Sequence, residues 1–519
     1  MDFITDRAKL QFILAKHTQS RYNPSVGLFL LWEENGVTGA SLCDDPVCAC
    51  CLAGAPTFMG VLCETAYGRD IMTFFGGMGL KKVVKFGGSS LASAEQFQKV
   101  GNIIRADEGR RYVIPSAPGK RFSSDTKVTD LLYGCYDCAA AGGDFLPLLQ
   151  EIRARYDGII AGLGLSLSLE EKFEKIAADF ADKAGREYAA SRGEYLNGIV
   201  MAKYLGYTFI DAAQVVFFDE DGTFRSEETN EALAKRLAGV ERAVIPGFYG
   251  SVPETGVVKT FSRGGSDVTG SIVARAIHAD LYENWTDVSG FLVADPRIIE
   301  DPEVIETITY RELRELSYMG ATVLHEDAIF PIRREGIPIH IKNTNAPEDS
   351  GTLIVESTCR RPKYTITGIA GKKGFAVLNI EKAMMNAEIG FGRRVLGVFE
   401  ENGISFEHMP SGIDTMSVFV HQSEFEEKEQ KVLAGIHRAV QPDSIDMEAD
   451  LALVAVVGRG MRETRGTAGR IFSALAHAKV NVKMIDQGSS ELNIIIGVKN
   501  SDFETAIRAI YDIFVTTQL

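Results

Sequence analysis

The sequence has no apolar run of the roughly 20 residues that a bilayer-spanning helix needs. Its first ten residues, MDFITDRAKL, contain an early acid and no basic stretch before an apolar one, so no secretory signal is predicted. Positive charge is also scarce, since 55 lysines and arginines face 70 aspartates and glutamates, a formal net charge of −15. Such a surface would repel nucleic acid and anionic membranes. We therefore expect neither partner, and expect a cytoplasmic protein.

A disulfide or metal framework is missing as well. Five of the eight cysteines precede residue 78, and Cys135, Cys138 and Cys359 show no framework spacing. The segment CDDPVCACC (43–51) has spacing that suits zinc, but no second pair or histidine follows at a finger-like distance. We therefore assign no metal ligands. Residues 1–77 are poorly periodic and Met78 directly precedes a strand, so we expect these residues to be an upstream extension, possibly from a non-native start.

What the chain does have is length for two to four domains and an α/β pattern. Between residues 81 and about 354, short apolar strands alternate with amphipathic helices, which predicts a mostly parallel sheet covered on both faces. One helix is expected to start near Ser93, with Gln96 completing a capping box and Phe97, Val100 and Ile104 on its apolar face. The strand candidates are KVVKF (82–86), RYVIPSA (111–117), YTFID (207–211), RAVIPGF (242–248), ADLYENW (279–285) and IPIHIK (337–342). Ligands of such sheets bind beyond the carboxyl ends of the strands.

The C-terminal part contains an internal repeat with an offset of 76 residues. FAVLNI (375–380) aligns with LALVAV (451–456), and residues 395–412 align with residues 471–488. Each copy has the pattern strand, helix, strand, strand, which is part of a βαββαβ unit, and residues 503–514 supply a closing helix for the second copy. The polar segment 357–363 is the expected linker.

Three polar turns follow predicted strands. In VVKFGGSS (83–90), Gly87 and Gly88 would let backbone amides approach a phosphate, Ser89 and Ser90 add hydroxyl groups, and Lys85 adds a charge. The segment has no Walker-type GxxxxGK[ST] pattern, and Gly-Gly-Ser is also common in ordinary turns.

The second turn lies in VVKTFSRGGSDVTGS (257–271), with Ser266 as the expected N-cap of a helix. Arg263 would bind a carboxylate and Asp267 an ammonium group, so that the pair would recognise an amino acid; the alternative is a loop-stabilising ion pair. The third turn, ENWTDVSGFLVADPR (283–297), offers polar groups for a nucleotide.

Together these segments resemble the aspartate kinases of the amino-acid kinase superfamily. The resemblance rests on VVKFGGSS, SAPGK with KVTDLL, GEYLNG, PGFYG, FSRGGSDVTGS, WTDVSG with ADPR, and GATVLHEDAIFPI, in this order. It covers residues 81–519, because the repeat resembles the paired ACT modules of that family, and no homoserine dehydrogenase segment follows. The resemblance implies an α/β amino-acid kinase domain (78–356) and two ferredoxin-like ACT modules (365–445 and 446–519). A strand near 365–372 is a candidate to complete the second module.

The resemblance also implies an activity and a set of site residues. The activity is ATP- and Mg²⁺-dependent phosphorylation of the β-carboxylate of L-aspartate, the entry to lysine, threonine and methionine synthesis. For catalysis it implies Lys85, Gly87, Gly88, Ser89 and Asp267; for aspartate, Ser116, Thr129, Glu194, Phe248, Arg263, Ser266 and Asp267; and for ATP, Lys85, Thr286, Asp287, Asp295 and Arg297. Glu194 also suits a simple helix-start acid.

Two positions depart from the family pattern. Thr322 replaces a lysine that many members have, and Leu292 replaces a tyrosine; both positions are on the nucleotide side in the family. The loss of one phosphate-facing charge would weaken ATP binding by roughly 1 to 3 kcal/mol unless Arg297 or Lys342 compensates.

The resemblance further implies feedback inhibition by lysine or threonine, and a homodimer formed through the ACT modules. Effector positions carried over from the family are Met385, Ser405, Phe406, Glu407, Ser411 and Asp414. Lys483 stands where the second copy would have the counterpart of Glu407, so the copies are not expected to be equal sites. Two alternatives remain open: a related kinase acting on glutamate or N-acetylglutamate, and an amino-acid sensor with an inactive kinase core.

Overall fold

The computed structural model describes residues 28–34, 37–43, 80–262, 264–321, 324, 329–358 and 362–517. The chain divides into two units, residues 1–78 and 79–519. In the first, β1 (Leu28–Glu34) and β2 (Val37–Cys43) form an antiparallel hairpin. The other residues of the predicted extension, including 44–51 of the cysteine-rich segment, lie outside the described residues. Among the described helices, none is both long and apolar enough to cross a membrane.

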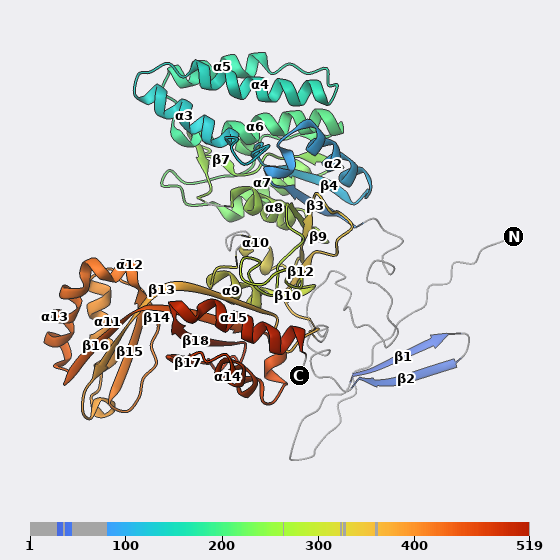
Figure 1. The fold of residues 1–519 in the computed structure, drawn as a ribbon. Helices are drawn as coiled ribbons and strands as arrows, with labels where there is room; N and C mark the ends of the chain where they lie inside the picture. The colour runs from blue at the N-terminus through green and yellow to red at the C-terminus, as the bar shows by residue number, and fades with distance from the viewer. Residues whose placement is uncertain are drawn as a thin grey trace. The chain divides into compact units, whose positions relative to one another are not determined.

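An eight-stranded sheet organises the first part of the large unit (Figure 1). In spatial order its strands are β10 (Thr307–Thr309), β12 (Thr352–Val355), β11 (Ile339–Asn343), β9 (Leu281–Thr286), β3 (Lys82–Phe86), β4 (Arg110–Pro115), β6 (Ala243–Val244) and β5 (Thr208–Phe209). Neighbouring strands run parallel except for β11 and β12. The mostly parallel sheet is therefore confirmed. A separate antiparallel hairpin joins β7 (Tyr249–Ser251) to β8 (Val258–Thr260).

Helices cover both faces of this sheet, because the side chains of each strand alternate between two cores. Val84 and Phe86 of β3 pack in one core with α2 (Ala94–Arg105), α3 (Val128–Ala140), α4 (Leu146–Gly162), α5 (Glu170–Ala181) and α6 (Arg186–Leu205). Val83 packs in the other core with α7 (Ser226–Leu237), α8 (Gly265–Ala276), α9 (Tyr310–Tyr318) and α10 (Phe330–Arg333). The carboxyl ends of the central strands therefore open between two helical layers.

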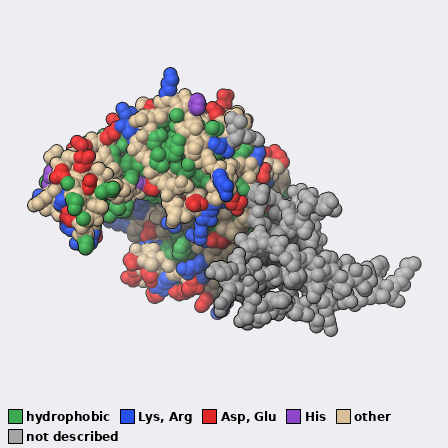
Figure 2. All heavy atoms as spheres, turned by 90° about the horizontal axis from the view of Figure 1, so that it is seen from below, with side chains coloured by type: hydrophobic (Ala, Val, Ile, Leu, Met, Phe, Trp, Pro, Cys, Tyr) green, Lys and Arg blue, Asp and Glu red, His purple; other side chains and the backbone are tan. Residues whose placement is uncertain are grey.

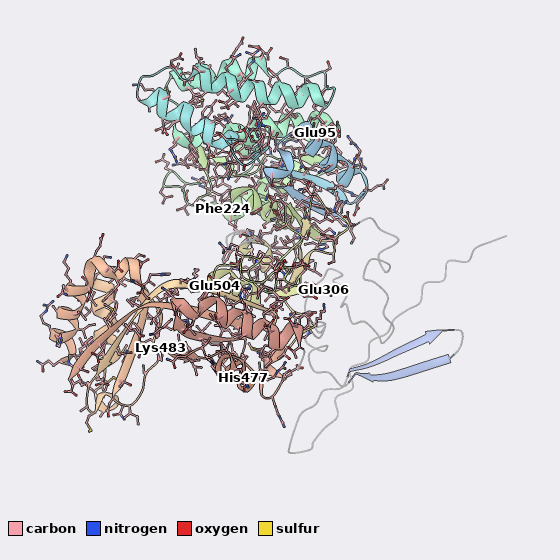
Figure 3. All side chains as sticks on the ribbon, in the orientation of Figure 1. Glu95, Phe224, Glu306, His477, Lys483 and Glu504 are labelled. Atoms are coloured by element: carbon pink, nitrogen blue, oxygen red, sulfur yellow. The ribbon has the colours of Figure 1, made fainter. Side chains whose placement is uncertain are left out.

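Helix α2 begins as predicted at the N-cap Ser93, whose side chain accepts a hydrogen bond from the Gln96 backbone at 3.4 Å. The predicted apolar face, including Phe97 and Val100, is buried. The reciprocal half of the capping box is replaced, because the Gln96 side chain donates to Asn345 instead. Glu95 lies in the first turn of the helix (Figure 3), where its charge suits the positive end of the helix dipole.

The second part of the unit is an antiparallel six-stranded sheet. Its spatial order is β14 (Phe406–His408), β15 (Thr415–His421), β13 (Gly368–Glu381), β16 (Ser444–Val457), β18 (Asn493–Lys499) and β17 (Met484–Asp486). The helices of this part are α11 (Phe391–Glu401), α12 (Gln422–Phe425), α13 (Glu429–Val440), α14 (Thr467–His477) and α15 (Phe503–Tyr511).

The repeat seen in the sequence recurs in this sheet. Both β16 and α14 start 76 residues after their counterparts β13 and α11. The two long strands serve both copies: residues 375–381 of β13 pair with β15 on one side and with residues 444–451 of β16 on the other, and residues 368–373 pair with residues 452–457 of β16. Residues 451–457 of β16 pair in turn with β18. Each copy thus borrows a strand segment from the other, and the two form one continuous sheet.

Helix α9 connects the two sheets through polar contacts. Buried Glu312 forms an ion pair with Arg459 at 2.9 Å and accepts a hydrogen bond from Thr367. Farther along the helix, the Tyr318 hydroxyl donates to Glu407 of β14 at 2.8 Å. On the face shown in Figure 2, acidic, basic and apolar side chains of the described residues are interspersed.

Candidate active site

Polar and glycine-rich segments follow four neighbouring strands of the eight-stranded sheet. They are residues 87–90 after β3, 116–127 after β4, 246–248 after β6 and 287–289 after β9. Because these strands are parallel neighbours, their carboxyl ends lie at one edge of the sheet. The predicted site residues are distributed over these segments and over the helices that pack beside them.

Lys85 lies at the centre of this edge. Its side chain is buried, and its Nζ lies 2.6 Å from Oδ1 of Asp267 in the first turn of α8. The same ammonium group is 3.4 Å from Oδ1 of Asn284, and the amide of Asn284 donates to Asp267 at 2.9 Å. Three polar side chains from β3, β9 and α8 thus fix one another before any ligand is present.

The two glycines of the turn after β3 have different surroundings. A β-carbon built on Gly87 would meet only Lys85 Nζ and the Trp285 carbonyl, each at 3.7 Å, so the space beside Gly87 faces the lysine amine. A β-carbon on Gly88 would lie 2.8 Å from the Ala117 carbonyl oxygen. Position 87 therefore has room for a side chain beside the lysine amine, whereas close backbone packing requires glycine at position 88, and the predicted ligand role of Gly87 stays a prediction. Ser89 and Ser90 then enter a short 3₁₀ helix, in which the Ser90 hydroxyl lies 2.8 Å from that of Thr344.

Ser116 and Glu194 lie together beyond β4. The backbone N–H of Ser116 donates to the Phe86 carbonyl, and its own carbonyl accepts from Asn197 of α6 at 2.6 Å. Glu194 lies one helical turn before Asn197 in α6. It is buried, and its Oε2 has no hydrogen-bond partner among the described residues. Burial raises the pKa of Glu194 to about 7, although a hydrogen bond from the Ala117 backbone opposes the shift. A buried carboxyl group with an unused oxygen is suited to a cationic ligand group.

Phe248 and Ser266 meet where the loop after β6 touches the start of α8. Phe248 has a φ of 79°, in the left-handed region that non-glycine residues rarely adopt, and its N–H donates to Thr269 at 3.0 Å. A β-carbon on Gly247 would lie 2.6 Å from the Ser266 side chain, so the two segments are in close contact. The prediction that Ser266 caps α8 is wrong: Gly264, with a φ of 57°, is the N-cap, and Ser266 lies inside the helix. Thr129 is half-buried in the first turn of α3.

Arg263 lies outside the described residues, as does Thr322. Two of the predicted nucleotide residues, Thr286 and Asp287, lie at the end of β9, where the Thr286 hydroxyl is 3.3 Å from the Asp287 carboxylate.

Asp295 and Arg297 mainly contact each other. The carboxylate of Asp295 accepts from Arg297 Nη2 at 2.6 Å, and this contact keeps the pKa of Asp295 below its usual range. Arg297 is largely exposed, with 86% of its side chain accessible. Among the described residues, no hydrogen bond or ion pair joins this pair to Lys85. Leu292 is half-buried and bridges to Val304, and Lys342 donates to the Asp349 carbonyl.

Several residues of the site were not predicted. Asn284 contacts both Lys85 and Asp267, and a buried asparagine within a strand is a signal that the sequence offered. Asn197 holds the Ser116 carbonyl. Gly119 packs against Gly88, and its N–H donates to the Gly88 carbonyl at 2.7 Å. That last contact joins two loops that are distant in sequence, so a local pattern could not reveal it.

The predicted effector residues lie in the first copy of the repeat. Met385 is buried, whereas Ser405 and Phe406 are exposed. The side chain of Glu407 is only 6% exposed and lies 3.3 Å from His421 as well as near Tyr318. In the neighbouring loop, Asp414 accepts from the Met384 backbone at 2.9 Å, and Ser411 bonds to the Met409 carbonyl. Lys483 of the second copy, labelled in Figure 3, forms an ion pair with Glu448 at 2.6 Å.

Among the described residues, no group of three or more histidine, cysteine, aspartate or glutamate side chains is arranged to hold a metal ion. The site at the sheet edge offers a lysine, backbone amides, hydroxyl groups and the carboxylates of Asp267, Glu194 and Asp287. This arrangement suits the binding of a phosphorylated compound and of a small zwitterion side by side.

Comparison with known proteins adds to this geometry. A model of the amino acid kinase family matches residues 81–343, which include every described residue of the sheet edge, and an ACT domain model matches residues 454–514. Aspartokinase 3 of Bacillus subtilis (strain 168) is 41% identical over 452 residues, which cover 83% of this chain and 98% of that protein.

Solved structures of aspartate kinases are also similar to this chain. The aspartate kinase of Clostridium acetobutylicum is 52% identical, with a TM-score of 0.77 over 83% of this chain and 99% of that one. Aspartokinase III of E. coli has been solved in complex with aspartate and ADP, and with lysine and aspartate. These two structures are 23% and 24% identical to this chain, with TM-scores of 0.63 over 83% of this chain and 99% of theirs, and support the fold alone.

Proposed function

Because the chain belongs to the amino acid kinase family, and within it to the aspartokinases, we propose that it transfers the γ-phosphoryl group of ATP to the β-carboxylate of L-aspartate. The product is 4-phospho-L-aspartate. The observation that carries this proposal is the buried contact of 2.6 Å between Lys85 and Asp267, beside the open space at Gly87. It places a cation and bare backbone amides at one point, as phosphoryl transfer requires.

The chemistry needs no general base. The β-carboxylate of aspartate has a pKa of about 4, so it is already ionised at neutral pH. Catalysis then depends on alignment of this carboxylate with the γ-phosphoryl group and on neutralisation of the charge that grows on the phosphate oxygens. We assign the neutralisation to Lys85 and to the amides of Gly88 and Ser89, since the Gly87 amide donates to the Trp285 carbonyl, with Asp267 and Asn284 holding the lysine in place. Mg²⁺ would arrive bound to ATP as part of the substrate.

Aspartate recognition is assigned to the other side of the edge. The unpartnered oxygen of Glu194 suits the α-ammonium group, and Arg263 would bind the α-carboxylate. Ser116, Thr129, Phe248 and Ser266 would complete this pocket. The nucleotide would lie toward Thr286 and Asp287. Asp295 and Arg297 would have to exchange their mutual contact for ATP, which makes them the weakest members of the set.

The six-stranded sheet supports a proposal for the regulation and assembly of the enzyme. We propose a kinase domain of residues 78–356 and two ACT modules, 365–445 and 446–519, the second completed by residues 368–373. Lysine or threonine would bind the first module near Asp414 and Glu407 and inhibit the enzyme. The exposed apolar side chains of Met384, Ile389 and Ile413, with 70% or more of each accessible, support a homodimer through this module. A cytoplasmic location remains a prediction from the sequence.

One assay tests the activity. The chain is incubated with ATP, Mg²⁺ and hydroxylamine, which traps an acyl phosphate as a coloured hydroxamate. Hydroxamate with L-aspartate, and not with glutamate or N-acetylglutamate, is expected. If hydroxamate forms only with glutamate or N-acetylglutamate, that acid is the substrate in place of aspartate. If no acid gives hydroxamate, the result favours an amino-acid sensor with an inactive kinase core. Lysine and threonine, alone and combined, are then added to test the effector proposal.

A further inference from the structure

The loop that follows β4, residues 116–127, is interlocked with the glycine turn after β3. The N–H of Gly119 donates to the Gly88 carbonyl at 2.7 Å. A β-carbon built on Gly119 would lie 2.6 Å from the Gly88 carbonyl carbon and 2.7 Å from the Ser89 nitrogen. Since a β-carbon fits at neither glycine, the register between the two loops is fixed by backbone contact.

A buried ion pair with α4 holds this loop in place. Arg155 of α4 lies 3.0 Å from Asp125, donates to the Thr126 carbonyl at 3.0 Å, and also donates to the Gly119 carbonyl. Arg155 and Asp125 are only 6% and 7% exposed. Asp125 accepts further hydrogen bonds from the backbone and side chain of Arg121, which hold the pKa of that carboxyl well below its usual range. Since a buried ion pair adds little net stability, its clearest effect here is to fix the loop.

Lys120 is the residue that this arrangement presents. Consecutive α-carbons are about 3.8 Å apart, so Lys120 starts one residue from the backbone that touches Gly88 and Ser89. Its side chain is exposed, and its Nζ donates to the neutral Ser123 carbonyl at 3.4 Å, a long contact. A lysine stem can therefore bring its ammonium group to an anion bound on the amides of the glycine turn.

Two of the cations with a predicted phosphate role are already paired with carboxylates. Lys85 faces the carboxylate of Asp267 at 2.6 Å, so the pair is formally neutral, and Arg297 is likewise neutralised by Asp295. Bound ATP brings several negative charges to this point, and they grow on the phosphate oxygens during transfer. Among the described residues of the two interlocked loops, Lys120 has no carboxylate contact and can supply an unbalanced positive charge.

We propose that Lys120 is a second phosphate-contacting cation, and that Arg155 and Asp125 are positioning residues that hold the loop bearing it. This inference rests on the proposed kinase activity for its role in turnover. Nucleotide binding tests it separately, because the contact with phosphate does not depend on which acid is phosphorylated. Substitution of an ordinary surface lysine would change neither turnover nor nucleotide affinity.

The experiment uses the full chain and compares Lys120→Met, Lys120→Arg and Lys127→Met. Lys127 is an exposed lysine at the other end of the same loop, which makes it a matched control. Rates are measured by hydroxamate formation at varied MgATP and varied aspartate, and MgADP affinity by calorimetry. Thermal unfolding shows that each variant is folded.

For Lys120→Met we expect kcat/KM for ATP to fall at least tenfold and MgADP affinity to fall at least fivefold, with KM for aspartate within twofold. Lys120→Arg should recover to within threefold of the parent chain, and Lys127→Met should stay within twofold. Kinetics and affinity of Lys120→Met within twofold of the parent would overturn the proposal, as would an equal loss in Lys127→Met.

The positioning role is tested by Arg155→Lys alone and combined with Lys120→Met. If Arg155 acts through Lys120, the double variant should be no worse than Lys120→Met, whereas two additive losses would contradict the role. A parent chain that binds MgADP but makes no aspartyl hydroxamate would refute the proposed activity while the affinity comparison still decides the role of Lys120. A parent chain that binds no nucleotide would overturn both.

Discussion

The edge of the eight-stranded sheet and the loops of the first repeat copy carry the two halves of the predicted chemistry, and they are built differently. At the sheet edge, Lys85, Asp267 and Asn284 are buried and bonded to one another. In the first copy, Ser405 and Phe406 are exposed, and Asp414 serves a local backbone turn. The proposed catalytic groups are therefore preorganised within one chain, whereas the proposed regulatory groups need a ligand or a second copy to become a site.

The largest expected effect comes from removal of the cation at the centre of the edge. In Lys85→Met the carboxylate of Asp267 stays behind, now unpaired, and repels the phosphates that the lysine should attract. We expect kcat to fall more than a hundredfold with the fold retained. Steady-state hydroxamate assays and circular dichroism measure the two quantities, with Lys127→Met as control. Near-normal turnover would remove Lys85 from the mechanism.

The two adjacent glycines offer a sharper comparison within the edge itself. Gly87→Ala places a methyl group in ordinary contact distance of Lys85 Nζ, so it should spare stability but reduce kcat/KM for ATP by about tenfold. Gly88→Ala presses a methyl group against the Ala117 carbonyl and should lower the free energy of unfolding by about 1 to 3 kcal/mol. Denaturant titration measures the free energy of unfolding of each variant, and steady-state kinetics measure its kcat/KM for ATP. Equal stabilities of the two variants would show that the interlocked loops are not rigid.

Much of this architecture could be predicted from local patterns. The strand before Gly87 and the helix after Ser93 are encoded within a few residues, and the 76-residue repeat preserves the spacing of its core. The N-cap of α8 was predicted at the wrong residue, because the sequence alone does not show that Gly264 adopts a left-handed φ. The contact of Gly119 with Gly88 and the burial of Glu194 depend on segments far apart in the chain. Local reasoning found the chemical groups but not the packing that gives them their properties.

Glu194 links burial to a pH dependence. With a pKa raised to about 7 by burial, Glu194 is increasingly protonated as the pH falls below 7, and a neutral carboxyl group loses its attraction for the ammonium group of aspartate. We expect kcat/KM for aspartate to fall about tenfold per pH unit below pH 7, because this parameter reports the free enzyme. Glu194→Gln should be slower and should lack this dependence. A flat profile of the parent chain between pH 5.5 and 7.5 would contradict the role.

The smallest expected effect concerns the contact that joins the two regions. The Tyr318 hydroxyl of α9 donates to Glu407, which is a predicted effector residue, so this bond connects the kinase part to the first module. Tyr318→Phe removes the bond and retains the ring, and one exposed hydrogen bond contributes about 0.5 to 1.5 kcal/mol. The concentration of lysine or threonine for half-inhibition should therefore shift by about two- to tenfold. Turnover without effector should stay within twofold, because the Tyr318 side chain contacts Glu407 and Lys372, and neither residue belongs to the sheet edge. If turnover falls and the inhibitor response is unchanged, the bond supports the kinase fold itself and does not couple the two regions.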